Sequence, residues 1–200
     1  MLENILTRNY FNSIAQEWET KQAEQREKIE YLLSRINLQR YDFVLDVGCG
    51  TGVLFPYLAK FSNGKTKIFA IDFARSMIQS AAQKNFNSIH ILCGCARYLP
   101  FPNNMFDCII AFHVLPHIRG KKLALKECWR VLKSHGELDI IHLHSSYEIN
   151  AIHEKIGGTV KNHKLASAGQ MAKLLHQINF KISDSVDRSG EYYIRATKSV

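Results

Sequence analysis

Short apolar runs alternate with amphipathic stretches along most of this chain. The runs are rich in Ile, Leu, Val and Phe, as buried strands are, and they cover residues 43–47, 68–71, 89–93, 106–112 and 137–143. Stretches with apolar residues at helical spacing precede or separate these runs, at residues 4–18, 22–36, 53–61, 74–84 and 121–132. Strands that alternate with helices favour a parallel sheet with right-handed crossovers. We therefore expect a doubly wound α/β fold.

The end of the chain predicts one more helix and two more strands. Residues 167–177 have a helical pattern with Ser167 at the N-cap, where a hydroxyl can accept from the first backbone N–H groups. Residues 181–186 and 192–197 read as strands, and the Ser-Gly pair between them is close enough for a hairpin. We expect the last of these strands to be antiparallel.

Residues 44–52, VLDVGCGTG, combine a buried strand, an acid and three alternate glycines. Such a strand ends in a turn that only glycine tolerates, and Gly48, Gly50 and Gly52 would let a nucleoside-bearing ligand approach the backbone beside free N–H groups of the next helix. The spacing alone fits a ligand-free surface turn equally well. A second apolar run, however, ends in Asp72, 26 residues after the first acid. The Rossmann arrangement places the acid that binds both ribose hydroxyls there.

Five segments spread over most of the chain carry a family pattern. They are YFNSIAQEW at residues 10–18, VLDVGCGTG at 44–52, IFAIDFARSMI at 68–78, CARYLPFPNNMFDCIIAFHVLPHI at 95–118 and LKECWRVLKSHGEL at 125–138. In this order they resemble the class I S-adenosylmethionine-dependent methyltransferases, specifically the compact small-molecule branch. The resemblance implies an enzyme with S-adenosylmethionine as cofactor and a Rossmann-like, seven-stranded, mostly parallel sheet whose last strand is antiparallel.

The resemblance also implies cofactor-binding residues by position. Asp46 would help to hold the amino group of the methionine moiety, and Asp72 would bind the ribose hydroxyls. The other implied cofactor contacts lie in the glycine turn and after the second, third and fourth strands: Gly48, Cys49, Gly50, Gly52, Phe73, Met77, Cys95, Ala96, Phe112 and His113. An N-terminal segment with Phe11, Ala15 and Trp18 would form part of a lid.

Three histidines are candidates for proton transfer. Methyl transfer from a sulfonium is an in-line displacement with an activated donor, so alignment can supply much of the acceleration. An acceptor thiol, hydroxyl or acidic carbon must also lose a proton, and imidazole suits that task near neutral pH. The candidates are His113 and His117 after the fourth strand and His144 after the fifth. Each of them fits a packing or capping role as well.

Two segments depart from the family pattern. The family often has Gly-Asp-Ala after the third strand, where this chain has Gly94-Cys95-Ala96, so the carboxylate that accepts from the adenine amino group is missing. This departure predicts weaker adenine recognition, or recognition by backbone atoms. The family usually has Pro-Gly-Gly before the fifth strand, where this chain has Ser134-His135-Gly136, which we expect to form a turn.

A second set of histidines raises the question of a metal site. His142 and His144 would lie on one face of a strand, with His153 and His163 in the following segment. Two imidazoles and a third ligand can hold a transition metal, but solvated or packed histidines are the better interpretation in a chain with nine of them. We therefore expect no metal. The five cysteines lack CxxC spacing, and we expect all of them to be free thiols.

Length and hydropathy predict how the chain is organised. A chain of 200 residues, 46% of them hydrophobic, can bury one sizeable core, so we expect a single domain over residues 1–200. Its parts would be a helical lid at 1–40, a cofactor-binding core at 41–144, and an insertion, a helix and the C-terminal strand pair at 145–200. The sequence has neither an apolar run that spans a bilayer nor a signal peptide, so we expect a cytoplasmic protein without a membrane partner, as a monomer or weak homodimer.

Three classes of function compete. The first is a methyltransferase whose small-molecule acceptor is enclosed by the N-terminal helices and residues 145–167. The second is a nucleic-acid methyltransferase, which the net charge of +8 suggests. Against it, the basic residues lie among apolar ones as in an ordinary amphipathic helix, and the fourth strand leads into Ala111-Phe112-His113-Val114 rather than an Asn-Pro-Pro-aromatic sequence. The third is a non-catalytic binding protein that kept the fold, suggested by Cys95. We favour the first.

Overall fold

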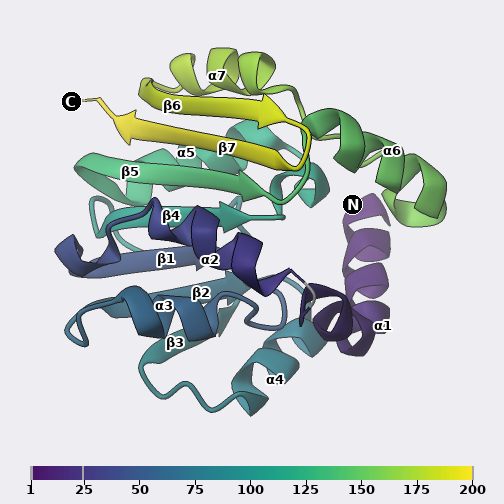
Figure 1. The fold of residues 1–200 in the computed structure, drawn as a ribbon, viewed down its shortest axis with the longest axis horizontal. Coiled ribbons are helices and arrows are strands. Elements are labelled where there is room, and N and C mark those ends of the chain that lie inside the picture. Colours follow the sequence, from purple (N-terminus) through teal and green to yellow (C-terminus); the bar gives the residue numbers. More distant parts are fainter. Residues whose placement is uncertain (1, 24, 200) are drawn as a thin grey trace.

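Seven strands form one sheet in the computed structural model of this protein (Figure 1). The structure describes residues 2–23 and 25–199, with the side chains of residues 5–15 and 25–199. The strand order is β3-β2-β1-β4-β5-β7-β6. The strands are β1 (Phe43–Val47), β2 (Lys67–Asp72), β3 (Ile89–Cys93), β4 (Phe106–Phe112), β5 (Leu132–His142), β6 (Phe180–Arg188) and β7 (Glu191–Lys198). Strands β1 to β5 pair in parallel and β7 is antiparallel to both of its neighbours, which confirms the predicted fold class.

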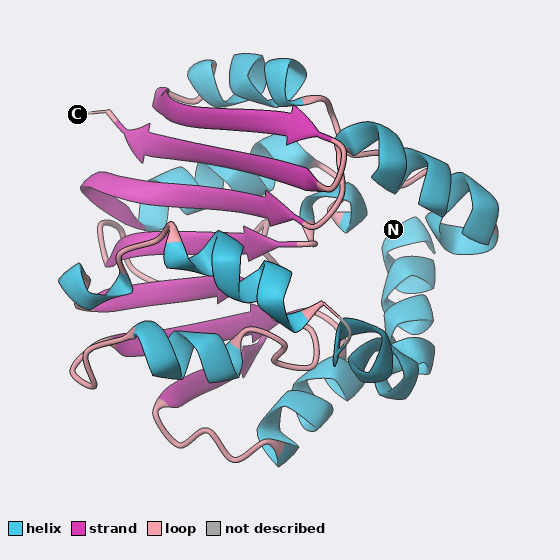
Figure 2. Ribbon diagram, viewed as in Figure 1, coloured by secondary structure: helices cyan, strands magenta, loops and turns pink. Residues whose placement is uncertain are grey.

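Helices cover both faces of this sheet (Figure 2). They are α1 (Leu2–Ala23), α2 (Arg26–Ser34), α3 (Phe55–Phe61), α4 (Arg75–Gln83), α5 (Lys121–Val131), α6 (Ser146–Ile156) and α7 (Ala168–His176), with short 3-10 turns η1 (Leu38–Arg40), η2 (Leu115–His117) and η3 (Gly158–Val160). One core cluster packs α5 and α7 on one face, and a second packs α2 and α3 on the other. Burial from both sides explains why β1 and β4 are mainly apolar, each with a single aspartate.

Strand β5 corrects one sequence-based expectation. It begins at Leu132 rather than at Glu137, and the predicted turn at residues 134–136 lies inside the strand. In the pairing with β4, Phe106 lies opposite Leu132 and Cys108 opposite Glu137, so β5 carries extra residues as a bulge. The prediction of a turn was wrong because glycine and polar residues suit a bulge as well as a turn, and only the neighbouring strand distinguishes the two.

Helices α1 and α6 lie beyond the carboxyl ends of the parallel strands, at the right of Figure 1. In α1, Phe11 and Ala15 pack against Ala74 and Met77 at the start of α4. The side-chain carbonyl of Asn12 accepts a hydrogen bond of 3.0 Å from the backbone N–H of Ser76. A helix is therefore present where the sequence predicted one, and its role as a lid stays a prediction. The side chain of Trp18 lies outside the described residues.

Helix α6 belongs to the segment that the sequence showed only as an insertion. Ser145 caps it and forms a reciprocal capping box with Glu148. The Glu148 carboxylate also accepts from the backbone N–H of Gly190 at 2.9 Å, in the β6–β7 turn. The Asp187 carboxylate accepts from the backbone N–H and the hydroxyl of Ser146, at 2.8 and 2.7 Å. The C-terminal hairpin thus fixes the start of α6 over the sheet edge.

Candidate functional site

The turn after β1 contains the three glycines in left-handed backbone conformations, with φ of +74°, +54° and +76° at Gly48, Gly50 and Gly52. A β-carbon at Gly48 would lie 2.1 Å from a methyl carbon of Val114, and one at Gly52 would lie 2.7 Å from the ring of Phe55. A β-carbon at Gly50 would meet no atom closer than 4.0 Å. The absence of a β-carbon therefore serves packing at Gly48 and Gly52, where a protein side chain occupies that position. Approach of a ligand to this turn stays a prediction.

Asp72 ends β2 and faces this turn. One carboxylate oxygen accepts from the backbone N–H of Gly50 at 3.0 Å, and the other accepts from the backbone N–H of Ala74 at 2.8 Å. Burial raises the pKa of Asp72, while these backbone N–H groups lower it. Each oxygen accepts one bond here and keeps a lone pair for a further donor.

Asp46, at the end of β1, is a buried carboxyl without a partner. It is 1% exposed, and within the described part of the chain neither of its oxygens has a hydrogen-bond partner. Burial, together with the nearby charge of Asp72, raises the pKa of Asp46 to about 8. The equally buried Asp139, by contrast, accepts from Arg195 at 2.9 Å and from the hydroxyl of Tyr193 at 2.5 Å. Without a partner this carboxyl is mostly protonated at pH 7, whereas a cationic group bonded to it would favour its charged form; the site therefore suits a cation.

Two adjoining cavities at the carboxyl ends of β1, β2 and β4 form what we call the cofactor cleft, with volumes of about 60 and 100 Å³. They share Gly48, Asp72, Phe73, Val114 and His117. The expected cofactor residues on the wall of the first cavity are Asp46, Gly48, Cys49, Gly50, Asp72, Phe73, Met77, Phe112 and His113, and those on the second are Gly48, Asp72, Phe73, Cys95 and Ala96. Gly52 lines neither of the two cavities.

The cleft lies where the strand order of the sheet reverses. β1 pairs with β2 on one side and with β4 on the other, so successive strands are added on one side of β1 up to β3 and on its other side from β4 onward. Open α/β sheets bind their ligands in the crevice at such a switch point. The position of the cleft is therefore the one that the fold itself provides for a ligand.

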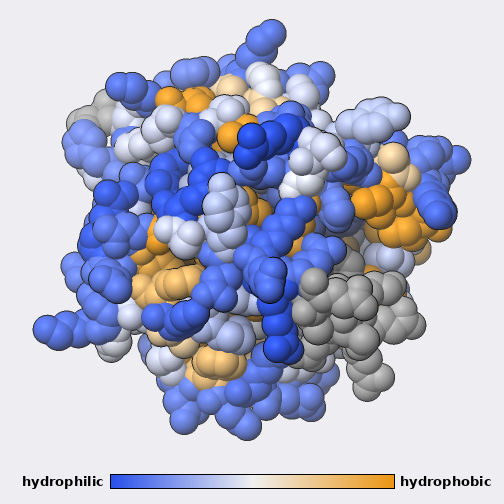
Figure 3. All heavy atoms as spheres, in the orientation of Figure 1, coloured by the Kyte–Doolittle hydropathy of each residue, from blue (hydrophilic) through white to orange (hydrophobic). Residues whose placement is uncertain are grey.

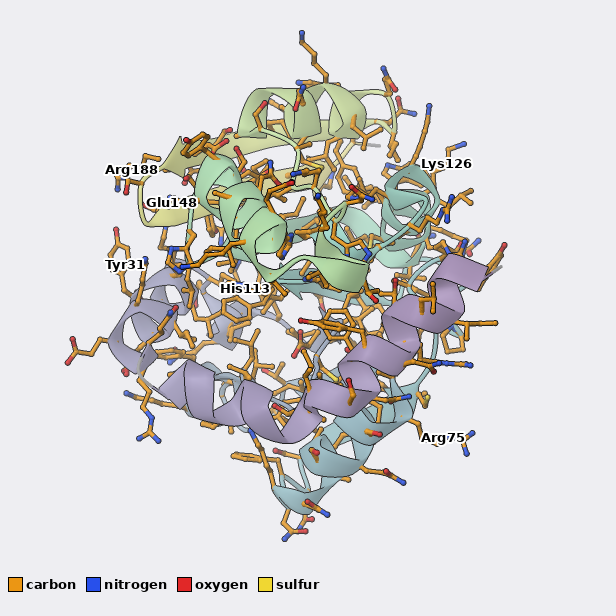
Figure 4. The ribbon with its side chains drawn as sticks, turned by 90° about the vertical axis from the view of Figure 1, so that its right-hand side faces the viewer. Tyr31, Arg75, His113, Lys126, Glu148 and Arg188 are labelled. Carbon is orange, nitrogen blue, oxygen red and sulfur yellow. The ribbon has the colours of Figure 1, made fainter. Side chains whose placement is uncertain are left out.

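A third cavity of about 280 Å³, here called the histidine cavity, adjoins the cofactor cleft. Five histidines line it: His113, His117, His142, His144 and His153. Phe11, His113 and His117 belong to the walls of both spaces. Figure 4 views this end of the molecule, with His113 in the middle between α1 and α6. The expected proton-transfer candidates His113 and His117 thus lie where the two spaces meet, whereas His144 lines the histidine cavity alone.

His113 is held in a defined tautomer. Its backbone has φ of +54°, and its Nε2 accepts a hydrogen bond of 3.1 Å from the backbone N–H of Leu143. Burial lowers the pKa of His113 to about 3, so the ring is neutral at pH 7. A neutral imidazole whose Nε2 accepts must carry its proton on Nδ1. His113 therefore offers an N–H donor, not a free base nitrogen.

His117, His153 and His163 tie the segment after α6 to the site. The Nδ1 atoms of His117 and His163 are 3.0 Å apart, and Nε2 of His163 lies 3.4 Å from the hydroxyl of Thr7 in α1. Nδ1 of His153 lies 2.5 Å from the backbone carbonyl oxygen of His163. Burial lowers the pKa of all three imidazoles. Among the described residues, no group of three or more His, Cys, Asp or Glu is arranged to hold a metal ion.

Sequence reasoning missed two parts of the site. The first is Val114, which fills the space beside Gly48 and lines both cavities of the cofactor cleft. The second is the apolar wall that α6 and η3 give the histidine cavity, formed by Ile149, Ile152, Ile156 and Val160. Figure 3 shows apolar atoms exposed over α6, where Ile152 and Ile156 are 39% and 55% exposed. A helical spacing of isoleucines at 149, 152 and 156 was the available signal.

Comparison with known proteins supports the family. A family model described as a methyltransferase domain matches residues 45–140. A solved S-adenosylmethionine-dependent methyltransferase structure from Thermotoga maritima superposes with a TM-score of 0.77 at 20% identity, covering 96% of this chain and 100% of that one. The domain match and the shared fold support a class I S-adenosylmethionine-dependent methyltransferase, the family that the sequence motifs resemble. The family and fold imply S-adenosylmethionine as the cofactor.

Two curated relatives add detail. The chain is 32% identical to the ubiquinone/menaquinone biosynthesis C-methyltransferase UbiE of Vibrio cholerae over 133 residues, which are 64% of this chain and 50% of the relative. It is 30% identical to the demethylmenaquinone methyltransferase of a Geobacillus species over 113 residues, 54% of this chain and 48% of that protein. The chain therefore spans about half the length of these relatives. No helix in residues 2–23 or 25–199 is long and apolar enough to cross a membrane.

The residues of the cleft fit this cofactor. The unpartnered Asp46 carboxyl suits a cationic amino group, and the free lone pairs of Asp72 suit two hydroxyl donors. Open space at Gly50 allows close approach to the backbone. Cys95 stands on the wall of the second cavity at the place where the family often has aspartate. Asp72 is the one carboxylate among the described residues that line that second cavity.

Proposed function

We propose that this protein transfers a methyl group from S-adenosylmethionine to a small-molecule acceptor bound in the histidine cavity. The observation that carries the proposal is the unpaired, buried Asp46 in a cleft whose wall continues through His113 and His117 into a second, larger space. A donor in the first space and an acceptor in the second would meet at this common wall. Alignment of the two can account for roughly 7 to 11 kcal/mol of the barrier.

The chain's own residues would orient the donor and exclude water. When bound, S-adenosylmethionine supplies a methyl group on a positively charged sulfur. Asp46 would bind its amino group and Asp72 its ribose hydroxyls, while Phe73 and Met77 would pack near the adenine. Phe11, which is 9% exposed and lines both spaces, would cover the reacting centre from α1. The role of residues 1–40 as a lid is part of this proposal.

The acceptor that we infer is an apolar ring of the demethylmenaquinone type. Two observations support this choice. Of the two curated relatives, the one at 30% identity is named a demethylmenaquinone methyltransferase, and the one at 32% identity is named a C-methyltransferase of ubiquinone/menaquinone biosynthesis. The isoleucines of α6 also make one wall of the histidine cavity apolar, which suits a ring with little polar surface. Residues 145–200, through α6 and the hairpin that anchors it, would then select the acceptor.

Calorimetry and a transfer assay test the proposal in two stages. Titration with S-adenosylmethionine and with S-adenosylhomocysteine should give saturable binding. Incubation with a reduced demethylmenaquinone analogue should then add one methyl group to the ring, as read by mass spectrometry. Absence of binding at millimolar cofactor would contradict the proposal and favour a non-catalytic protein. Cofactor binding with transfer only to RNA, lost with increasing salt, would favour the nucleic-acid alternative instead.

A further inference from the structure

His142 is the most buried histidine of the histidine cavity, and its polar atoms are unused. We propose that His142 binds the hydroxyl group of a neutral acceptor and takes its proton. The proposal rests on the proposed function, since it concerns the acceptor side of the same site. It adds a residue that we did not expect to act in proton transfer, and it restricts the acceptor to molecules with a hydroxyl group.

The burial of His142 and its unpartnered ring nitrogens favour a ligand at this side chain. Its side chain is 1% exposed, and neither ring nitrogen has a hydrogen-bond partner anywhere in the described ranges. An imidazole has one N–H donor and one acceptor nitrogen, so two hydrogen bonds are left unmade in a place that water scarcely reaches. Each unsatisfied buried group costs stability, and such orphans are rare in proteins. The ring nevertheless lines the histidine cavity, which gives a ligand access to it.

His142 is held in place by packing on both sides. The ring of Tyr192 meets it edge to face, with ring centroids 5.5 Å apart and an interplanar angle of 89°. The hydroxyl of Tyr192 donates to the backbone carbonyl of Ala166 at 3.1 Å, so it is not available to His142. On the other side the ring centroid of His113 lies 5.0 Å away. The two imidazoles thus form a fixed pair at the end of β4 and β5.

This pair suits a hydroxyl group. The tautomer of His113 leaves its Nδ1–H as a donor, and His142 keeps one nitrogen that can accept. A hydroxyl group both donates and accepts, so it can bond to both rings at once, which an ether or a ketone cannot do. None of the described residues that line the histidine cavity is Asp, Glu, Lys or Arg. A charged acceptor would therefore find no counter-charge on this wall, and a neutral one is favoured.

The proton transfer is balanced without any further reactant. The O–H bond of the acceptor breaks, its proton moves to the free nitrogen of His142, and the electron pair left on oxygen is delocalised into the acceptor ring. A carbon of that ring would form the new bond to the methyl group, while the donor sulfur keeps the pair of the bond that breaks. That ring carbon then loses its own proton, which replaces the one taken from the oxygen. The ring of His142 becomes an imidazolium and later releases the proton to water. No atom is oxidised or reduced. The acceptor anion next to the ring would stabilise the imidazolium, as an opposite charge does for any buried histidine.

Binding of two matched probes tests the proposal. Para-nitrophenol, used at slightly acidic pH so that its hydroxyl group stays protonated, carries the hydroxyl group, and nitrobenzene is the same ring without it. The wild-type protein should bind para-nitrophenol at least about tenfold more tightly, as expected for two buried hydrogen bonds. His142→Phe should abolish this preference, whereas His176→Phe, on the exposed side of α7, should keep it. Equal affinities of the wild type for both probes, or an unchanged preference in His142→Phe, would overturn the proposal.

A second measurement does not depend on a variant that folds. In nitrogen NMR of labelled histidine side chains, para-nitrophenol should shift the ring signals of His142 in the wild type, and nitrobenzene should leave them in place. Unshifted His142 signals in the presence of bound para-nitrophenol would refute the assignment. The failure would be distinct from failure of the proposed function, which shows as absent cofactor binding in calorimetry while probe binding remains measurable.

Discussion

The buried carboxyl of Asp46 predicts a strong dependence of stability on pH. Burial raises the pKa of Asp46 to about 8 in the folded protein, while an unfolded chain restores a pKa close to 4. The folded state thus binds this proton more tightly than the unfolded state does. The contribution of Asp46 is most favourable below pH 4, and it is lost progressively as the pH rises to about 8.

Substitution of Asp46 by Asn isolates this effect. Each pH unit between the two pKa values corresponds to about 1.4 kcal/mol, and the group is half titrated at either end, so the unfolding free energy of Asp46→Asn should rise relative to that of the wild type by roughly 5 kcal/mol between pH 4 and pH 8. About 4 kcal/mol of that gain should be present at pH 7. Cofactor binding should weaken at the same time, because the amide carries no charge for an amino group.

Urea unfolding at a series of pH values measures the difference directly. The matched control is Asp42→Asn, which removes an exposed carboxyl just before the same strand. A flat difference for Asp46→Asn would show that this carboxyl is solvated or paired in the folded protein. The unpaired acid that supports the cofactor assignment would then not exist.

Three further outcomes are expected. Gly50→Ala should weaken cofactor binding in calorimetry with a modest loss of thermal stability. Gly52→Ala should lower the melting temperature further, because its β-carbon would lie 2.7 Å from a phenylalanine ring. The opposite order of the two melting temperatures would contradict this packing. Asp72→Asn should weaken cofactor binding by about 1 to 3 kcal/mol, and an unchanged dissociation constant would show that this acid does not contact the ligand. Protein purified without a histidine tag should contain less than about a tenth of an equivalent of zinc, copper or nickel, and a stoichiometric amount would identify a metal site that we do not expect.

The apolar runs in the sequence were enough to predict most strands of the sheet. The strands at residues 43–47, 89–93 and 106–112 were predicted with the bounds that the structure shows, because each is a mainly apolar run bounded by polar or glycine residues. The glycine turn and the acid that ends β2 follow from these strands, since parallel strands bring their carboxyl ends to one edge of the sheet. The order of the elements along the chain therefore determined the fold class and where a ligand would bind.

Tertiary structure decided which residues of that region have a free surface. Gly48, Gly50 and Gly52 are alike in sequence and in backbone conformation, yet open space remains only at Gly50, because Val114 and Phe55 pack against the other two. The first residue of β5 could not be predicted from the sequence either, because the segment that resembles a loop is a bulge in the pairing of β5 with β4.

The histidines show the same division. Their number and their positions after β4 and β5 are visible in the sequence, which could not say which ring nitrogens are already bonded. The structure engages His113 with a backbone N–H, pairs His117 with His163 and leaves His142 without a partner among the described residues. Periodicity along a chain reports which face of an element is buried, whereas the partner of a buried polar atom depends on segments distant in the sequence. The sequence by itself therefore determined the fold and the cofactor class, and only the packing of α1, α6 and the C-terminal hairpin over the sheet decided the shape and chemistry of the acceptor side.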